Sequence, residues 1–266
     1  MLRKSYFSGH FYSNSQSELA KEFEYFNNIA HEHFANKLYG LSSRALVVPH
    51  AGYMYSGFTA YLTYLNVNFS PKTVVVVGPS HRVYLKGASC VAFDSYETPF
   101  GEISCDKAYV EHLQKTRALL SYPQAHQEHS TEVQFPFIKH FFPQAKVVEI
   151  VYGDVSVQFL EDVLDDVFQD SQKLLVISTD LSHFYTQKEA NVLDAQCIKG
   201  VEQMSVDMVE KGEACGMKGL CAVVKVAKKH GLSSHVVDYR TSGDITSDFS
   251  RVVGYLGAIF TNNELY

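Results

Sequence analysis

The five cysteines of this 266-residue chain include no Cys-x-x-Cys pair. They are Cys90, Cys105, Cys197, Cys215 and Cys221. Their odd number and wide spacing argue against a disulfide framework and against zinc held by a cluster of thiolates. We therefore expect free thiols in a reducing compartment, and we predict a cytoplasmic protein.

Long apolar runs and clusters of positive charge are missing as well. No run approaches the roughly 20 apolar residues of a membrane-spanning helix. Residues 1–6 carry two positive charges but no apolar stretch follows them, so we expect no signal peptide and no membrane segment. The formal net charge is −6, and the basic residues form no patch, so binding to nucleic acid through phosphate neutralisation is not expected.

Linkers, repeats and several common catalytic signatures are also absent. No Ser/Gly-rich or Pro-rich tract divides the chain, and 46% of its residues are hydrophobic, which is enough to build one large core. We therefore predict a single domain over residues 1–266. The motifs HExxH, GxSxG, GxxxxGK[ST] and GxGxxG do not occur, which argues against zincins, elbow-type serine hydrolases, P-loop proteins and Rossmann dehydrogenases.

The chain does contain short β-branched runs that alternate with helical patterns. These runs lie at residues 45–48, 73–77, 146–151 and 173–178. Such runs are typical of strands buried on both faces of a parallel sheet. We predict a single three-layer α/β domain with a mostly parallel or mixed central sheet flanked by helices. The last two strands, at 235–239 and 252–260, lack a helix between them, which favours an antiparallel pair.

Two neighbouring strands each end in a histidine, in Pro49-His50-Ala51-Gly52 and Gly78-Pro79-Ser80-His81. In open α/β sheets, ligands gather beyond the carboxyl ends of the strands. Neutral imidazole suits iron, copper and zinc, and two histidines with a carboxylate form a known open iron(II) site. We therefore predict that His50 and His81 bind a metal. The alternative is that each ring binds a backbone group at its own strand end.

Asp180 and His183 follow another buried strand, three residues apart. His183 could act as a general base that Asp180 orients, or either residue could ligate a metal. The alternative is that Asp180 caps the next turn and His183 lies at the surface.

Two further groups are candidates for the same edge of the sheet. His129 and Glu132 lie on one face if a helix begins at Ser130. The alternative is that Glu132 only stabilises the helix N-terminus, where a negative charge interacts favourably with the helix dipole. Asp244 lies in the glycine-containing segment Thr241-Ser242-Gly243-Asp244, and there its alternative role is that of a turn residue.

Taken together, these segments resemble the Memo family, the Memo-like component of the AmmeMemoRadiSam protein group. The matching segments are Gly9-His10-Phe11-Tyr12, residues 49–57, residues 78–81, Thr98-Pro99-Phe100-Gly101-Glu102, Glu128-His129-Ser130-Thr131-Glu132, residues 178–183 and residues 241–244. They occur in the family's order and reach from near the N-terminus to the last strand, so the resemblance covers essentially the whole chain.

The resemblance implies a fold similar to that of the class III extradiol dioxygenases, which hold non-haem iron(II) with two histidines and one glutamate. It implies a metal site at His50 and His81, with Asp180 and His183 lining the same pocket. In animal members a cysteine of the last loop joins the two histidines in binding copper or iron. The corresponding residue here is Ile245, so the third ligand must come from elsewhere, with Asp244 the first candidate.

Three functions are compatible with these residues. The one we favour is a dioxygenase-like, metal-dependent oxidoreductase that holds Fe(II), or else copper or zinc, with His183 as acid or base and with His129 and Glu132 lining the pocket. The second is a non-catalytic binding or adaptor protein whose vestigial pocket holds no metal, and the third is a metal-assisted hydrolase. We expect a small-molecule or peptide ligand, and the resemblance implies a functional link to radical-SAM and AMMECR-type proteins.

Overall fold

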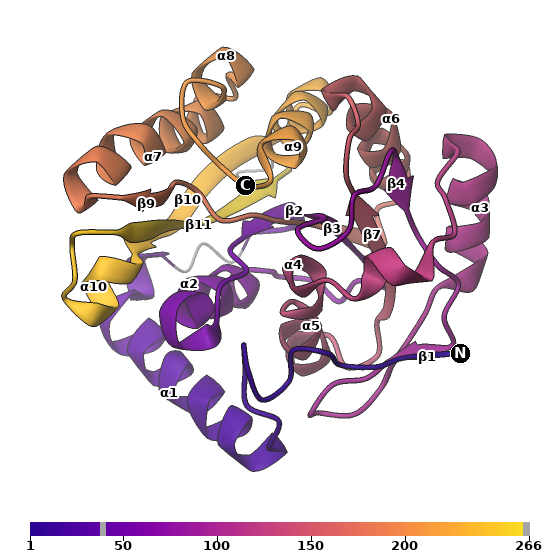
Figure 1. Cartoon of the computed structure of the whole chain (residues 1–266), viewed down its shortest axis with the longest axis horizontal. Helices are drawn as coiled ribbons and strands as arrows, with labels where there is room; N and C mark the ends of the chain where they lie inside the picture. The colour runs from indigo at the N-terminus through magenta and orange to yellow at the C-terminus, as the bar shows by residue number, and fades with distance from the viewer. Residues whose placement is uncertain (38–40, 263–266) are drawn as a thin grey trace.

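A computed structural model describes residues 1–37 and 41–262. Within these ranges, a central sheet of eight strands runs through the molecule (Figure 1). In sheet order the strands are β10 (Ser233–Thr241), β11 (Val252–Thr261), β2 (Ser43–Val48), β8 (Lys173–Ser178), β3 (Thr73–Pro79), β7 (Lys146–Tyr152) and β4 (Ala88–Ser89), and β9 (His183–Tyr185) pairs with β11.

The centre of the sheet is parallel and its edges are antiparallel. Strands β2, β8, β3 and β7 run parallel to one another, whereas β11 is antiparallel to β2, and β4 is antiparallel to β7. Strands β10 and β11 form the expected antiparallel pair. The mixed α/β sheet predicted from the sequence is therefore confirmed.

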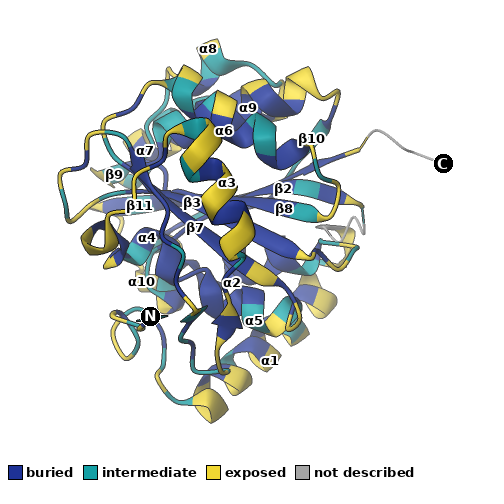
Figure 2. Cartoon of the chain, turned by 90° about the vertical axis from the view of Figure 1, so that its right-hand side faces the viewer, coloured by how far each residue is buried: buried dark blue, intermediate teal, exposed yellow. Residues whose placement is uncertain are grey.

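Helices cover both faces of this sheet (Figure 2). One face carries α3 (Lys107–Arg117), α6 (Val157–Phe168), α7 (Gln187–Glu202), α8 (Val206–Val209) and α9 (Met217–Lys229). The other carries α1 (Gln16–His33), α2 (Tyr53–Leu65), α4 (His129–Glu132), α5 (Phe135–Phe141) and α10 (Ser242–Thr246), and the 3₁₀ turns are η1 (Ala35–Lys37) and η2 (Pro123–His126).

Helix α6 shows how the sequence pattern produces these layers. Its N-cap Ser156 accepts a hydrogen bond from the backbone of Phe159, which satisfies one of the donors left free at a helix start. Its buried residues are Leu160, Val163, Leu164, Val167 and Phe168. This spacing forms one apolar stripe along the helix, and the stripe faces the core.

The N-terminal segment is attached by one buried arginine. Strand β1 (Leu2–Arg3) pairs with β5 (Ser95–Tyr96), which pairs with β6 (Ile103–Ser104) in a small separate sheet. Arg3 is buried, and its guanidinium forms ion pairs with Glu132 and with Glu149. Burial alone would lower the pKa of Arg3, but the two carboxylates raise it, so the cation is firmly held.

The sequence was expected to form neither disulfide bonds nor membrane-spanning helices, and both expectations can be compared with the structure. All five cysteines lie in the described part of the chain and are free thiols. In the same ranges, none of the helices combines the length and apolarity that crossing a membrane would require.

Candidate metal centre

The two strand-end histidines meet above the middle of the sheet. Each lies two residues beyond its strand, His50 after β2 and His81 after β3, and β8 lies between these strands. Their ring centroids are 5.2 Å apart. The topological argument from the sequence thus brings the two side chains together, although their binding of a metal stays a prediction.

His50 is held in place through both of its ring nitrogens and its backbone. Its Nδ1 is hydrogen-bonded to Oγ of Ser178 at 3.1 Å, and its backbone N–H donates to Oδ1 of Asp180 at 2.7 Å. Burial, followed by the nearby His81 and His129, holds the pKa of His50 well below its usual value. The ring is therefore neutral at pH 7, as a metal ligand must be, and Nε2, which is hydrogen-bonded to the thiol of Cys215, is the nitrogen that a metal would bind.

Cys215 occupies the position in front of that nitrogen. Its Sγ lies 3.3 Å from Nε2 of His50, and together with His81 these side chains form a set of donors within 4.8 Å of one another. We call His50, His81 and Cys215 the cysteine group. Burial raises the pKa of the Cys215 thiol to about 12, so the thiol is protonated unless a metal displaces its proton.

The close approach of Cys215 depends on the glycine that follows it. A Cβ on Gly216 would lie 2.7 Å from both Cβ and Oγ1 of Thr179, a residue at the end of β8. Glycine therefore lets the loop before α9 lie directly on the strand end. The spacing of Cys215 from the other cysteines gave no indication that it lies beside His50. The available signal was the Cys-Gly pair at the start of a helix.

Glu128 and His129 form a second set of donors with His81. Glu128 is the N-cap of α4, and its Oε2 accepts the backbone N–H of His81 at 2.7 Å. Its Oε1 lies 3.2 Å from Nδ1 of His81 and 2.8 Å from Nδ1 of His129. We call His81, Glu128 and His129 the carboxylate group, since their donor atoms also lie within 4.8 Å of one another.

The glutamate of this group is ionised although it is buried. Burial raises the pKa of Glu128, but its interactions with the His129 and His81 side chains outweigh burial and hold the pKa below the usual range. Ser130 was expected to begin this helix, but Glu128 is its N-cap. Helix α4 can lie against β3 because Gly78 has no side chain: a Cβ there would be 2.7 Å from Oγ of Ser130.

Asp180 and His183 do not form the predicted pair. Asp180 fixes the backbone of His50 instead, and no hydrogen bond between Asp180 and His183 occurs among the described residues. Burial raises the pKa of Asp180, and the electrostatic influence of His183 on both Asp180 and His50 shows that the three groups are close. His183 therefore lies near the site, but Asp180 does not orient it by a direct contact.

Glu132 lies outside both groups, although it belongs to the same short helix as His129. Its carboxylate accepts hydrogen bonds from the backbone of Tyr6 at 2.9 Å and of Phe7 at 2.7 Å, and it pairs with Arg3. The structure thus places Glu132 as an anchor for the N-terminal segment and not beside the histidines.

Asp244, the sequence-based candidate for the third ligand, is also elsewhere. Its Oδ2 accepts the backbone N–H of Thr241 at 2.7 Å in a capping box at the start of α10. Neither donor set among the described residues includes it. Ile245 is 42% exposed. Asp244 is the third residue of α10, and its carboxylate completes the capping box of the N-cap Thr241, so it lies in the first turn of a helix and not in the turn of the alternative role.

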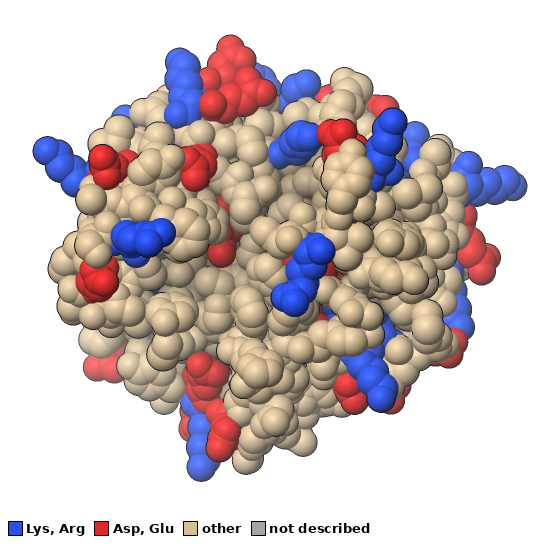
Figure 3. All heavy atoms as spheres, in the orientation of Figure 1, with Lys and Arg blue, Asp and Glu red and all other residues tan. Residues whose placement is uncertain are grey.

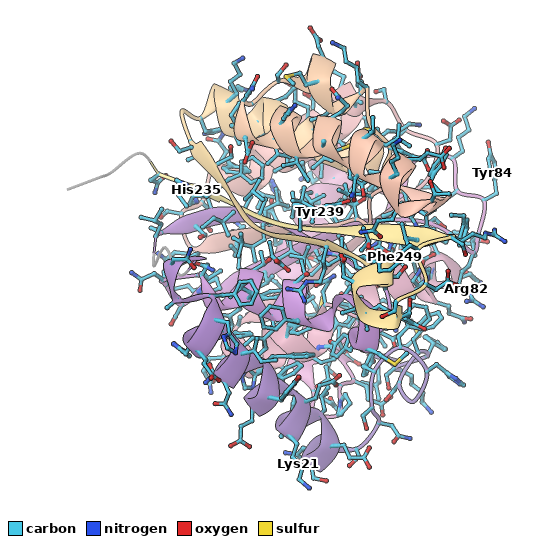
Figure 4. All side chains as sticks on the ribbon, turned by 90° about the vertical axis from the view of Figure 1, so that its left-hand side faces the viewer. Lys21, Arg82, Tyr84, His235, Tyr239 and Phe249 are labelled. Carbon is cyan, nitrogen blue, oxygen red and sulfur yellow. The ribbon has the colours of Figure 1, made fainter. Side chains whose placement is uncertain are left out.

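A cavity of about 360 Å³ opens beside Cys215, and the described residues that line it include neither His50 nor His81. Its lining includes Ser80, Tyr84, Tyr152, Asp154, Cys215 and Lys218. Tyr84 is 83% exposed and projects outward at the edge of the molecule (Figure 4). The face at which α4, β9 and α10 lie is hollowed, and acidic and basic side chains alternate around it without a patch of one sign (Figure 3).

Comparisons with known proteins show which family the chain is similar to. The family model described as "Memo-like protein" matches residues 3–259. A MEMO1 family protein of Aquifex aeolicus is 34% identical over 238 residues, which cover 83% of this chain and 86% of the relative. One of Methanobrevibacter smithii is 31% identical over 283 residues, covering 98% of this chain and all of the relative.

A solved structure shows the same fold. The uncharacterized protein JW3007 from Escherichia coli K12 superposes with a TM-score of 0.50 at 10% sequence identity, covering 82% of this chain and 99% of that one. At this identity the likeness concerns the arrangement of helices and strands alone.

Proposed function

Because the chain belongs to the Memo family, we propose that it is a metal-dependent oxidoreductase of the dioxygenase-like type. The proposed metal is Fe(II), its ligands are His50, His81 and Cys215, and its substrate is a small organic molecule. The single observation that carries the proposal is the convergence of these three donors at the carboxyl edge of the sheet. In this fold class that edge is the usual place for a ligand.

The distance between His50 and Cys215 fits two ligands of one ion. Metal–nitrogen bonds of about 2.0–2.1 Å and metal–sulfur bonds of about 2.3 Å place two neighbouring ligands between about 3.1 and 3.6 Å apart. The observed separation of Nε2 of His50 from Sγ of Cys215 is 3.3 Å. The bond from Nδ1 of His50 to Ser178 adds the outer contact that commonly fixes a ligating imidazole.

An iron(II) ion would supply the redox chemistry and the open coordination positions that a reaction with oxygen needs. The chain supplies the surroundings. The cavity beside Cys215 has room for a small molecule, and Lys218, which pairs with Asp154 at 3.6 Å, offers a cation at its wall. His183, near both Asp180 and His50, is the group we assign to proton transfer with the substrate.

Binding of nitric oxide tests whether the metal keeps an open position. After anaerobic loading with Fe(II), we expect the protein to form an iron–nitrosyl complex visible by electron paramagnetic resonance. The His50→Ala/His81→Ala double variant should form none, because it lacks two of the three ligands. His31→Ala is the matched control, since His31 is an exposed histidine of α1, and its signal should equal that of the parent.

Two results would contradict the proposal. Iron that is bound but gives no nitrosyl complex would indicate a closed, structural site. No bound iron at all would favour the alternative function, in which the pocket binds a peptide or small ligand without chemistry.

A further inference from the structure

The carboxylate group offers a second place for a metal, beside the first. We propose that His81, Glu128 and His129 hold a second divalent ion, such as Mn(II), Fe(II) or Zn(II), and that the site is therefore a two-metal centre in which His81 is shared. The inference rests on the proposed function only for the neighbouring ion of the cysteine group.

The spacing of the three donors fits ligation of one ion. Two ligands at right angles, each about 2.1 Å from one ion, are about 3.0 Å apart. Oε1 of Glu128 is hydrogen-bonded to Nδ1 of His81 at 3.2 Å and lies 2.8 Å from Nδ1 of His129. The second contact lacks hydrogen-bond geometry, so Nδ1 of His129 is buried without a hydrogen-bond partner. This nitrogen is the donor of the group with an unused position for an ion.

The surroundings of Glu128 give an independent argument. Its side chain is buried, and in the described ranges no lysine or arginine pairs with it; its ion-pair partners are His81 and His129 alone. The other two buried glutamates nearby, Glu132 and Glu149, share the guanidinium of Arg3. Glu128 is thus the buried carboxylate of the three for which a divalent ion could supply the counter-charge.

The positions of the rings are fixed from outside the group. The backbone N–H groups of His81 and Ser130 donate to the carboxylate of Glu128, at 2.7 and 3.2 Å, which orients it as outer contacts orient metal ligands. The ring of His129 packs against Phe11 and Phe7, with centroids 4.9 and 5.7 Å away. The site is thus largely formed before any ion arrives.

His81 can serve both groups as an imidazolate. A neutral imidazole has one N–H and one ring nitrogen with a free lone pair, so two bound ions would displace the N–H proton to solvent. Nδ1 of His81 faces Glu128, which leaves Nε2 for the ion of the cysteine group. The two positions differ in chemistry: two nitrogens and a carboxylate suit Mn(II), which avoids thiolates, whereas Fe(II) and Zn(II) are accepted by both groups.

The experiment counts zinc ions. Untagged protein is dialysed to equilibrium against Zn(II), and the bound metal is measured by elemental analysis. We expect two ions per chain in the parent. Glu128→Gln and His129→Ala should each retain one, and Cys215→Ser should also retain one. Asp244→Asn is the matched control, since Asp244 is an exposed carboxylate in neither group, and it should retain two. Circular dichroism confirms that each variant is folded.

A second measurement distinguishes the positions. Mn(II), which avoids thiolate ligands, should bind to Cys215→Ser as to the parent and should bind at least tenfold more weakly to Glu128→Gln. The proposal is overturned if the parent binds one zinc ion and Glu128→Gln and His129→Ala bind as the parent does; the proposed function would survive that result. A parent that binds no zinc or iron overturns both.

Discussion

Replacing Arg3 by methionine is expected to lower the free energy of unfolding by about 3–5 kcal/mol, the usual cost of removing one partner from a buried ion pair. The guanidinium is 2% exposed and is the cation shared by Glu132 and Glu149. Methionine has a similar length but leaves Glu132 buried without a cation and Glu149 with His126 as its ion-pair partner. Urea unfolding followed by circular dichroism measures the change.

Lys4→Met is the matched control, because Lys4 is the exposed neighbour of Arg3, and its effect should stay within about 0.5 kcal/mol. An Arg3→Met variant as stable as the parent would show that the two carboxylates do not need this cation.

The effect of Arg3→Met should also depend on pH. Burial raises the pKa of Glu149, but Arg3 and then His126 outweigh burial and hold it below its usual value. A carboxylate with a depressed pKa stabilises the parent above its unfolded pKa, about 4.3, and that stability is lost as the pH falls towards the folded pKa. Without Arg3, burial would dominate and would raise the pKa of Glu149. Protonation of Glu149 as the pH falls would then remove the buried charge that destabilises the variant. The difference in unfolding free energy between parent and variant should therefore shrink between pH 7 and pH 4.

The second large effect is expected for His81→Ala. His81 is the one residue that belongs to both donor groups, so its removal leaves each group with only two ligands. We expect the affinity for Zn(II) to fall at least about 100-fold, which corresponds to about 2.7 kcal/mol. Competition with a fluorescent zinc chelator measures this affinity directly.

The single-group variants provide the comparison for His81→Ala. Cys215→Ser and Glu128→Gln each disturb one group and should leave one ion bound at close to the parental affinity. If His81→Ala binds zinc as tightly as either of these variants, His81 is not a ligand shared by the two groups.

The sequence was sufficient to predict the part of the site that depends on local pattern and sheet topology. A buried β-branched run followed by Pro-His or Pro-Ser-His is visible in the printed chain. The rule that parallel strands deliver their carboxyl ends to one edge then brings His50 and His81 together. The same reasoning predicted the mixed α/β sheet with its antiparallel last pair, both of which the structure shows.

The remaining donors could not be predicted because tertiary contacts bring them to the site. Cys215 arrives from the loop before α9, and Glu128 from the start of α4, each over a glycine that permits backbone contact. The directions in which the side chains point could not be predicted from the sequence either. Asp180 was expected to orient His183 but accepts a hydrogen bond from the backbone of His50, and Glu132 points to the N-terminal segment although His129 lies three residues away.

Asp244 shows the limit of an argument by elimination. Because Ile245 stands at the position of the family cysteine, Asp244 was the nearest residue in sequence that could replace that cysteine as the third metal ligand. In the structure a cysteine is still present beside His50, but it comes from residue 215, on a different loop. Proximity along the chain was a poor guide, because the loop that carries Asp244 uses it to begin a helix.

The central claim is that His50 and His81 hold a metal ion. The most direct test is elemental analysis of untagged protein purified anaerobically in the presence of Fe(II), alongside the His50→Ala/His81→Ala double variant. The account predicts at least one iron ion per chain in the parent and none above background in the folded double variant. Equal iron in both proteins, or none in either, would contradict it.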